Sequence, residues 1–194
     1  MSAWKSASDG AAGEAAAPAP DWKELERVVK TETSAVTVCI ELSRLFRVRQ
    51  TEVALLRLEN GLLRFLFPAE LATAGAIPLS SSSAIAAHTA SAKKVELYNS
   101  FLKVKHASVF ESVKLGNPEE NAKWEQPPIQ RLMSAPVLDA QGSVLGVIQV
   151  CRKGLDLSSS GLEFSLEDLR HLELAAESLA KASFMQPGAE VSAS

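Results

Sequence analysis

The chain has 194 residues, of which 46% are hydrophobic and 22% are charged, so it is long enough to bury one stable core. The formal net charge of −3 at pH 7 gives no basic face for nucleic acid, and no run of about 18 apolar residues is present to cross a membrane. The N-terminal residues lack the apolar block of a signal peptide, so we expect a cytoplasmic protein.

The first predicted element is one long helix over residues 22–47, where apolar residues recur at helical intervals. Asp21 and Glu24 have the spacing of a capping box at its start. The sequence on either side of the predicted domain is rich in Ala, Gly, Ser and Pro, which bury little surface. We therefore divide the chain into a disordered tail at residues 1–20, a domain at 21–185 and a disordered tail at 186–194.

A β-hairpin is predicted next. Residues 51–59 and 62–67 each have the composition of a strand. Asn60-Gly61 between them indicates a type I′ turn, because both turn positions require a positive φ. Residues 68–77 are then expected to form a loop.

A short helix is expected after that loop, with Ser80 to Ser83 as candidate N-caps and an end near Ser91. Residues 95–98 predict a short strand. Residues 99–130 are irregular apart from a helix expected over residues 107–113. A segment of this length without clear periodicity is often functional.

A second hairpin is predicted from residues 131–138 and 143–152, which are joined by a turn containing Gly142. The last element is the clearest, because Ser165 and Asp168 form a capping box ahead of an apolar helical stripe. Two hairpins indicate an antiparallel sheet, and the helices before and after it are expected to bury their stripes on one sheet face. The sequence thus predicts an α/β protein of the α+β type.

The order of these elements and several local phrases resemble the GAF domain family. Residues 129–139 resemble the penultimate strand of that family, residues 142–150 its last core strand, and residues 164–169 the start of its closing helix. Residues 77–87 and 94–99 resemble its second helix and the strand that follows. The resemblance implies a central six-stranded antiparallel sheet, with the N- and C-terminal helices on one face. Short helices and a lid would cover the other face and enclose a pocket.

Family members that bind cyclic nucleotides carry an Asn-Lys pair, then a Phe, then Asp-Glu. Here Asn99-Ser100 stands where Asn-Lys is expected, and Phe110-Glu111 lies downstream without the Asp-Glu pair. The resemblance therefore does not extend to cyclic-nucleotide binding. No cysteine lies in the lid or pocket segments, which argues against covalent attachment of a bilin. The sequence does not identify a cofactor.

The irregular segment and the resemblance together indicate a candidate ligand pocket. Ser82 and Ser83 lie at a predicted helix N-terminus, where hydroxyls and backbone amides bind anions, although plain capping and turn formation are the simpler explanation. The apolar lid residues either line an open pocket or fill it as core. Three histidines are too scattered for a metal site, and none is predicted. The candidate pocket and lid residues are Ser82, Ser83, Asn99, Phe101, His106, Phe110, Glu111, Trp124 and Met133.

These patterns predict a non-catalytic sensory or regulatory module in signal transduction, which binds a small molecule or a protein partner and signals through a homodimer of its terminal helices. One alternative is an interaction module with a collapsed pocket. Another is a GAF-type methionine sulfoxide reductase, which needs two reactive thiols, whereas Cys39 and Cys151 lie in apolar patterns outside the lid. The residues predicted at the dimer contact are Leu25, Val29, Val36, Leu169, Leu172 and Ala176.

Overall fold

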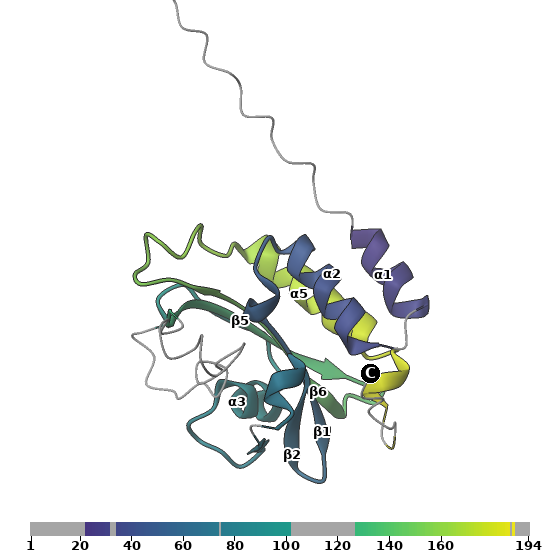
Figure 1. Cartoon of the computed structure of the whole chain (residues 1–194). Coiled ribbons are helices and arrows are strands. Elements are labelled where there is room, and N and C mark those ends of the chain that lie inside the picture. Colours follow the sequence, from purple (N-terminus) through teal and green to yellow (C-terminus); the bar gives the residue numbers. More distant parts are fainter. Residues whose placement is uncertain (1–21, 32–33, 74, 102–126, 187, 189–194) are drawn as a thin grey trace, which may run out of the picture.

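The computed structural model describes residues 22–31, 34–73, 75–101, 127–186 and 188 (Figure 1). A six-stranded sheet lies at its centre in the order β3-β2-β1-β6-β5-β4, and every neighbouring pair is antiparallel. The predicted α+β architecture is confirmed, whereas the predicted tails and domain bounds stay predictions. The strands are β1 (Val53–Glu59), β2 (Leu62–Phe67), β3 (Ala76–Pro78), β4 (Glu96–Tyr98), β5 (Ile129–Leu138) and β6 (Val144–Lys153).

Both predicted hairpins form because their turns carry the required local chemistry. Asn60 and Gly61 have φ angles of 50° and 77°, as a type I′ turn requires, and they join β1 to β2. In the turn between β5 and β6, Oδ1 of Asp139 accepts hydrogen bonds from the backbone N–H groups of Gln141 (2.9 Å) and Ser143 (2.7 Å). The turns and strand pairing fix the register, and register decides which sheet face each side chain occupies.

Three helices cover one face of the sheet: α1 (Trp22–Thr31), α2 (Ala35–Leu45) and α5 (Leu166–Leu179) (Figure 1). We call this the terminal-helix face. The predicted capping box is confirmed at the start of α5. Ser165 Oγ accepts from the backbone N–H of Asp168 (3.0 Å), and Asp168 Oδ2 accepts from the backbone N–H of Ser165 (2.7 Å). The apolar cluster on this face includes Leu42, Val53, Leu55, Met133, Ile148, Val150 and Leu172.

The opposite face is covered by α3 (Ile85–Ala92), and we call it the α3 face (Figure 1). Because successive side chains of a strand point to opposite faces, β1, β5 and β6 contribute alternate residues to the two sides. The sheet is therefore the middle layer between α3 and the terminal helices. The apolar cluster on the α3 face includes Leu56, Leu63, Ile85, Phe101, Leu132, Val147 and Cys151.

The prediction of a single helix over residues 22–47 is wrong, because α1 and α2 are separate helices. Ser34 is extended, with φ −100° and ψ 122°, and α2 starts at the next residue. At the end of α1 the Thr31 hydroxyl donates to the backbone oxygen of Arg27 (3.0 Å). Hydroxyl side chains offer the backbone alternatives to the helical ladder, and this junction is rich in them.

Part of the predicted loop over residues 68–77 is also wrong, because it contains most of β3, which pairs antiparallel with β2. Pro78 ends this strand, and proline is tolerated there because β3 lies at the sheet edge. The predicted serine cap of α3 is absent. The N-cap residue is Ala84, and no side chain caps the helix. The 3-10 turns of the described chain are η1 (Gln50–Glu52), η2 (Ala69–Leu71) and η5 (Ser183–Met185).

Candidate functional site

Two of the predicted pocket residues lie on different faces of the sheet. Phe101 is on the α3 face, only 2% exposed, with its ring edge-to-face against Tyr98 at 6.2 Å. Met133 lies beneath the terminal helices, so its prediction as a pocket residue is wrong. Its neighbour Leu132 faces α3 instead. The predicted residues outside the described ranges are His106, Phe110, Glu111 and Trp124.

The serines considered as a candidate anion site do not occupy the N-cap position of α3. Ser82 and Ser83 are exposed, and they precede the N-cap residue Ala84. The Ser83 hydroxyl lies 3.4 Å from that of Ser81. These serines therefore form a surface turn ahead of α3.

Asn99 has a structural partner that the sequence pattern did not reveal. Its Nδ2 donates to the backbone oxygen of Phe164 (2.9 Å), and the backbone N–H of Phe164 donates to Asn99 Oδ1 (3.0 Å). Phe164 immediately precedes Ser165, the N-cap of α5. This pair of bonds, which we call the Asn99 clamp, ties the end of β4 to the start of α5.

Arg131 holds the same two segments together through further hydrogen bonds. Its guanidinium donates to the backbone oxygens of Asn99 (3.1 Å), Leu157 (3.1 Å) and Gly161 (3.2 Å), and it lies 3.3 Å from the Glu163 carboxylate. The Arg131 side chain is only 8% exposed. One buried cation therefore fixes both the end of β4 and the loop that leads into α5.

A row of polar side chains crosses the otherwise apolar α3 face. Glu96 on β4 is opposite Ser134 on β5, and Ser134 is opposite Gln149 on β6. We call these three residues the polar row. Ser134 is fully buried and Gln149 is 4% exposed. Buried polar groups are retained only where they find partners, and the row finds them within itself and on α3.

The hydrogen bonds of the polar row run in one direction. Gln149 Nε2 donates to Ser134 Oγ (3.2 Å), and Ser134 Oγ lies 2.8 Å from the hydroxyl of Thr89 on α3. The Thr89 hydroxyl also bonds the Glu96 carboxylate. Because a carboxylate only accepts, Thr89 donates to Glu96 and accepts from Ser134.

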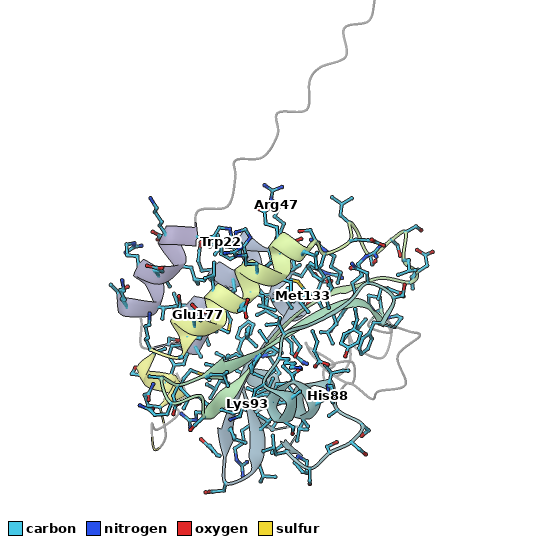
Figure 2. The ribbon with its side chains drawn as sticks, turned by 180° about the vertical axis from the view of Figure 1, so that it is seen from behind. Trp22, Arg47, His88, Lys93, Met133 and Glu177 are labelled. Atoms are coloured by element: carbon cyan, nitrogen blue, oxygen red, sulfur yellow. The ribbon has the colours of Figure 1, made fainter. Side chains whose placement is uncertain are left out.

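Glu96 is the acceptor at which this chain of bonds ends. It also accepts from the Tyr98 hydroxyl (2.8 Å), and it lies 2.7 Å from His88 Nδ1 on α3. An ionised Glu96 requires the hydrogen of neutral His88 to be on Nδ1. Burial, together with the bond to Glu96, raises the pKa of Tyr98 to about 12, so its hydroxyl stays a donor at neutral pH. The carboxylate thus joins α3 to β4. Figure 2 labels His88 on α3.

A model of the GAF domain matches residues 30–182, which is most of the chain. The chain belongs to the GAF domain family. The GAF domain of an Acinetobacter phosphoenolpyruvate-protein phosphotransferase superposes with a TM-score of 0.58 at 12% identity, covering 82% of this chain and 87% of that one. Residues 122 to 287 of a methyl-accepting chemotaxis protein give 0.56 at 12% identity, covering 80% and 92%.

A third GAF-like neighbour is the free methionine-R-sulfoxide reductase of Neisseria meningitidis, solved in complex with its substrate. It gives a TM-score of 0.55 at 15% identity, covering 82% of this chain and 84% of that one. At such identities the similarity shows the fold alone. A comparison with curated proteins finds no match.

The two cysteines of this GAF domain lie on opposite faces of its sheet. Cys39 belongs to the terminal-helix cluster and Cys151 to the α3-face cluster, and both are fully buried. Burial raises the pKa of the Cys39 thiol. Among the residues that the structure describes, no cluster of metal-ligating side chains is present, and no helix is long and apolar enough to span a bilayer.

The predicted dimer contact of this GAF domain is largely occupied by its own core. Leu25, Val29, Leu172 and Ala176 are at most 5% exposed, because α1, α2 and α5 pack against one another and the sheet. They are therefore not available to a second chain, and this part of the prediction is wrong. Val36 is 41% exposed. The homodimer itself stays a prediction.

Sequence reasoning missed the polar row, although its signal is visible. Ser134 and Gln149 are single polar residues within apolar strand runs. A polar residue at a core position must meet a partner from another element, so such residues mark candidate networks. Arg131, beside the same apolar run, gave a comparable signal.

Proposed function

We propose that this GAF domain is a non-catalytic, cytoplasmic sensory or regulatory module in signal transduction, which responds to a small molecule or protein partner on its α3 face. Two sets of hydrogen bonds, which the backbone of β4 connects, link α3 to α5 and carry the proposal. Thr89 on α3 bonds Glu96 on β4, and Asn99 just after β4 clamps Phe164 at the start of α5. An occupant that displaces α3 or β4 changes the contacts that hold α5 in place.

The energies involved suit such a response. An occupant shifts an equilibrium only by its difference in affinity for the two states, and a tenfold difference corresponds to about 1.4 kcal/mol. One intramolecular hydrogen bond contributes about 0.5–1.5 kcal/mol. Loss or gain of the Asn99 clamp is therefore within the range that an ordinary ligand preference can drive.

Two of the structural neighbours support a signalling role. Their names are those of a phosphotransferase GAF domain and a chemotaxis protein. We expect the terminal helices of this chain to pass the response to an output partner, through contact with a second copy.

Thermal unfolding tests the proposal directly. The probes are cyclic nucleotides, other nucleotides, free amino acids and haem. Each is added at a concentration about a hundred times a micromolar Kd. A bound probe stabilises the folded chain by about 2.7 kcal/mol at a hundred times its Kd. Ser134→Val should reduce that shift, because it interrupts the polar row, and the surface variant Ser82→Ala should leave it intact. A shift that both variants leave unchanged would contradict the α3 face as the site.

The second candidate is a protein-interaction module whose pocket is closed by core packing. Phe101 fills part of the α3 face, whereas Leu155 and Leu162 on the loop before α5 are 82% and 83% exposed. In this candidate function these two leucines would contact the partner protein. This function predicts no thermal shift with any probe in the panel.

A methionine sulfoxide reductase is disfavoured by the placement of the cysteines. That reaction needs an attacking thiolate and a resolving thiol within reach of each other. Cys39 and Cys151 are separated by the sheet, and both are fully buried. We expect no turnover of free methionine sulfoxide with dithiothreitol as reductant, and turnover lost in Cys151→Ser would reverse this conclusion.

A further inference from the structure

The loop between β6 and α5 carries several leucines whose side chains face solvent. Figure 1 shows this loop in yellow-green at one end of the sheet. Six large apolar side chains of the described chain are at least 39% exposed, and four of them lie within residues 155–166. They are Leu155 (82%), Leu157 (39%), Leu162 (83%) and Leu166 (78%). We call residues 155–169, which include the first turn of α5, the leucine segment.

The backbone of the leucine segment is fixed by contacts with the rest of the domain. Arg131 donates to the backbone oxygens of Leu157 and Gly161. The Asn99 clamp holds Phe164 at the start of α5. A backbone that is already ordered costs little further entropy when a partner binds it. The exposed leucines are therefore pre-organised for a contact.

Acidic side chains lie between these leucines. Residues 155–169 contain no Lys, Arg or His, and their carboxylates are those of Asp156, Glu163, Glu167 and Asp168. The Ser158 hydroxyl donates to Asp156 Oδ1 (2.7 Å), as does the backbone N–H of Ser159 (2.7 Å). These bonds lower the pKa of Asp156 to about 2. The leucine segment therefore keeps its negative charge at neutral pH.

The cations that pack against the leucine segment are mainly inside the protein. The Arg131 side chain is 8% exposed, and Lys153 is 4% exposed. Arg152 is half-buried. Arg49 reaches solvent but pairs with the Glu52 carboxylate (2.7 Å). The surface of the segment thus favours a basic partner and repels an anionic lipid surface.

The leucine segment has room for a partner side chain but no free strand edge. Leu155 borders a shallow hollow of about 490 Å³, whose lining includes Pro127 and Gly161. Residues 154–165 form no strand, so a partner does not extend the sheet here. A helix satisfies its backbone hydrogen bonds internally and therefore suits this surface better.

We propose that the leucine segment docks a basic amphipathic helix of a partner protein. This inference rests on the proposed function, for which it names the surface that an output partner contacts. The apolar face of such a helix covers Leu155, Leu162 and Leu166, and its cations meet the carboxylates between them. Arg131 and the Asn99 clamp tie the segment to the end of β4, so a displacement of β4 changes the shape of this surface.

Fluorescence anisotropy of a labelled leucine–lysine peptide, titrated with the full chain, tests the proposal. The peptide has about five helical turns, roughly 18 residues, with its leucines on one face. It should bind saturably, and the same peptide with glutamate in place of lysine should not. Leu162→Ser should raise the peptide Kd about tenfold. Glu167→Lys should raise it about threefold or more, because it replaces an attraction with a repulsion.

Two control variants change similar side chains outside the leucine segment. Val36→Ser alters an exposed apolar residue on α2, and Glu70→Lys reverses an exposed charge on η2. Both should leave the peptide Kd unchanged. Leu162 is 83% exposed, so Leu162→Ser should also leave the midpoint of thermal unfolding unchanged, which separates docking from folding.

The absence of saturable binding up to about 500 µM protein overturns the proposal. Equal Kd values for Leu162→Ser and Val36→Ser, or equal binding of the glutamate peptide, also overturn it. Cosedimentation of the wild type with phosphatidylcholine vesicles, if Leu162→Ser abolishes it, makes a lipid surface the occupant and overturns the helix. The thermal shifts with small molecules are measured separately, so failure of the docking surface is distinguishable from failure of the sensory function.

Discussion

The Asn99 clamp is the contact that most directly joins β4 to α5, and its removal has a calculable effect. Asn99→Ala deletes two hydrogen bonds, to Phe164 O and from Phe164 N–H. At about 0.5–1.5 kcal/mol for each bond, the free energy of unfolding should fall by about 1–3 kcal/mol. Phe164 is 2% exposed, so its freed backbone groups do not readily regain water. The loss should therefore lie in the upper half of that range.

Urea unfolding followed by circular dichroism measures this loss. Ser100→Ala is the matched control, because the neighbouring hydroxyl has no such clamp, and it should change the free energy by less than about 0.5 kcal/mol. Asn99→Asp should fall between the two, because its carboxylate still accepts from Phe164 N–H but repels the Phe164 carbonyl. Equal stabilities for Asn99→Ala and Ser100→Ala would refute the reasoning.

Three further predictions concern the packing and charge of the core. In Gly146→Ala the new Cβ would lie 2.0 Å from the backbone oxygen of Leu56, so urea unfolding should show a loss of about 3 kcal/mol or more. Burial works to raise the pKa of Glu52, but hydrogen bonds from Arg49 and backbone N–H groups outweigh it and hold the pKa below its ordinary 4.5. The stabilisation that ionised Glu52 provides is thus present above about pH 4.5 and is lost as the pH falls through the lower pKa of the folded state. Glu52→Gln should flatten this part of the plot of unfolding free energy against pH. Ser134→Val strands buried partners in the polar row and should lower the thermal midpoint more than Ser82→Ala does.

The features that could be predicted from the sequence are those that local chemistry decides. Asn60-Gly61 specifies its turn because few residues tolerate positive φ at both positions. Ser165 and Asp168 specify the start of α5 because their capping bonds stay within one turn. Once these turns and caps are placed, the order of strands and helices along the chain follows. That order resembles the GAF family, so a sheet between two helical layers could be expected.

The features that could not be predicted depend on contacts between distant segments. β5 is buried on both faces, so its apolar residues show no alternation, and nothing local placed Met133 beneath the terminal helices. β3 has three residues, too few for a period, and it exists through pairing with β2. The clamp joins Asn99 to Phe164 across 65 residues, a distance that no motif spacing encodes.

The central claim is that the α3 face and the start of α5 are coupled through Asn99. Hydrogen exchange of the amides from Phe164 to Leu172 measures it in four proteins: wild type, Thr89→Val, Asn99→Ala and the double variant. Thr89→Val should speed exchange in the wild-type background and add little once Asn99 is gone, because both changes act on one path. Equal effects of Thr89→Val in both backgrounds, or no effect in either, would contradict the account.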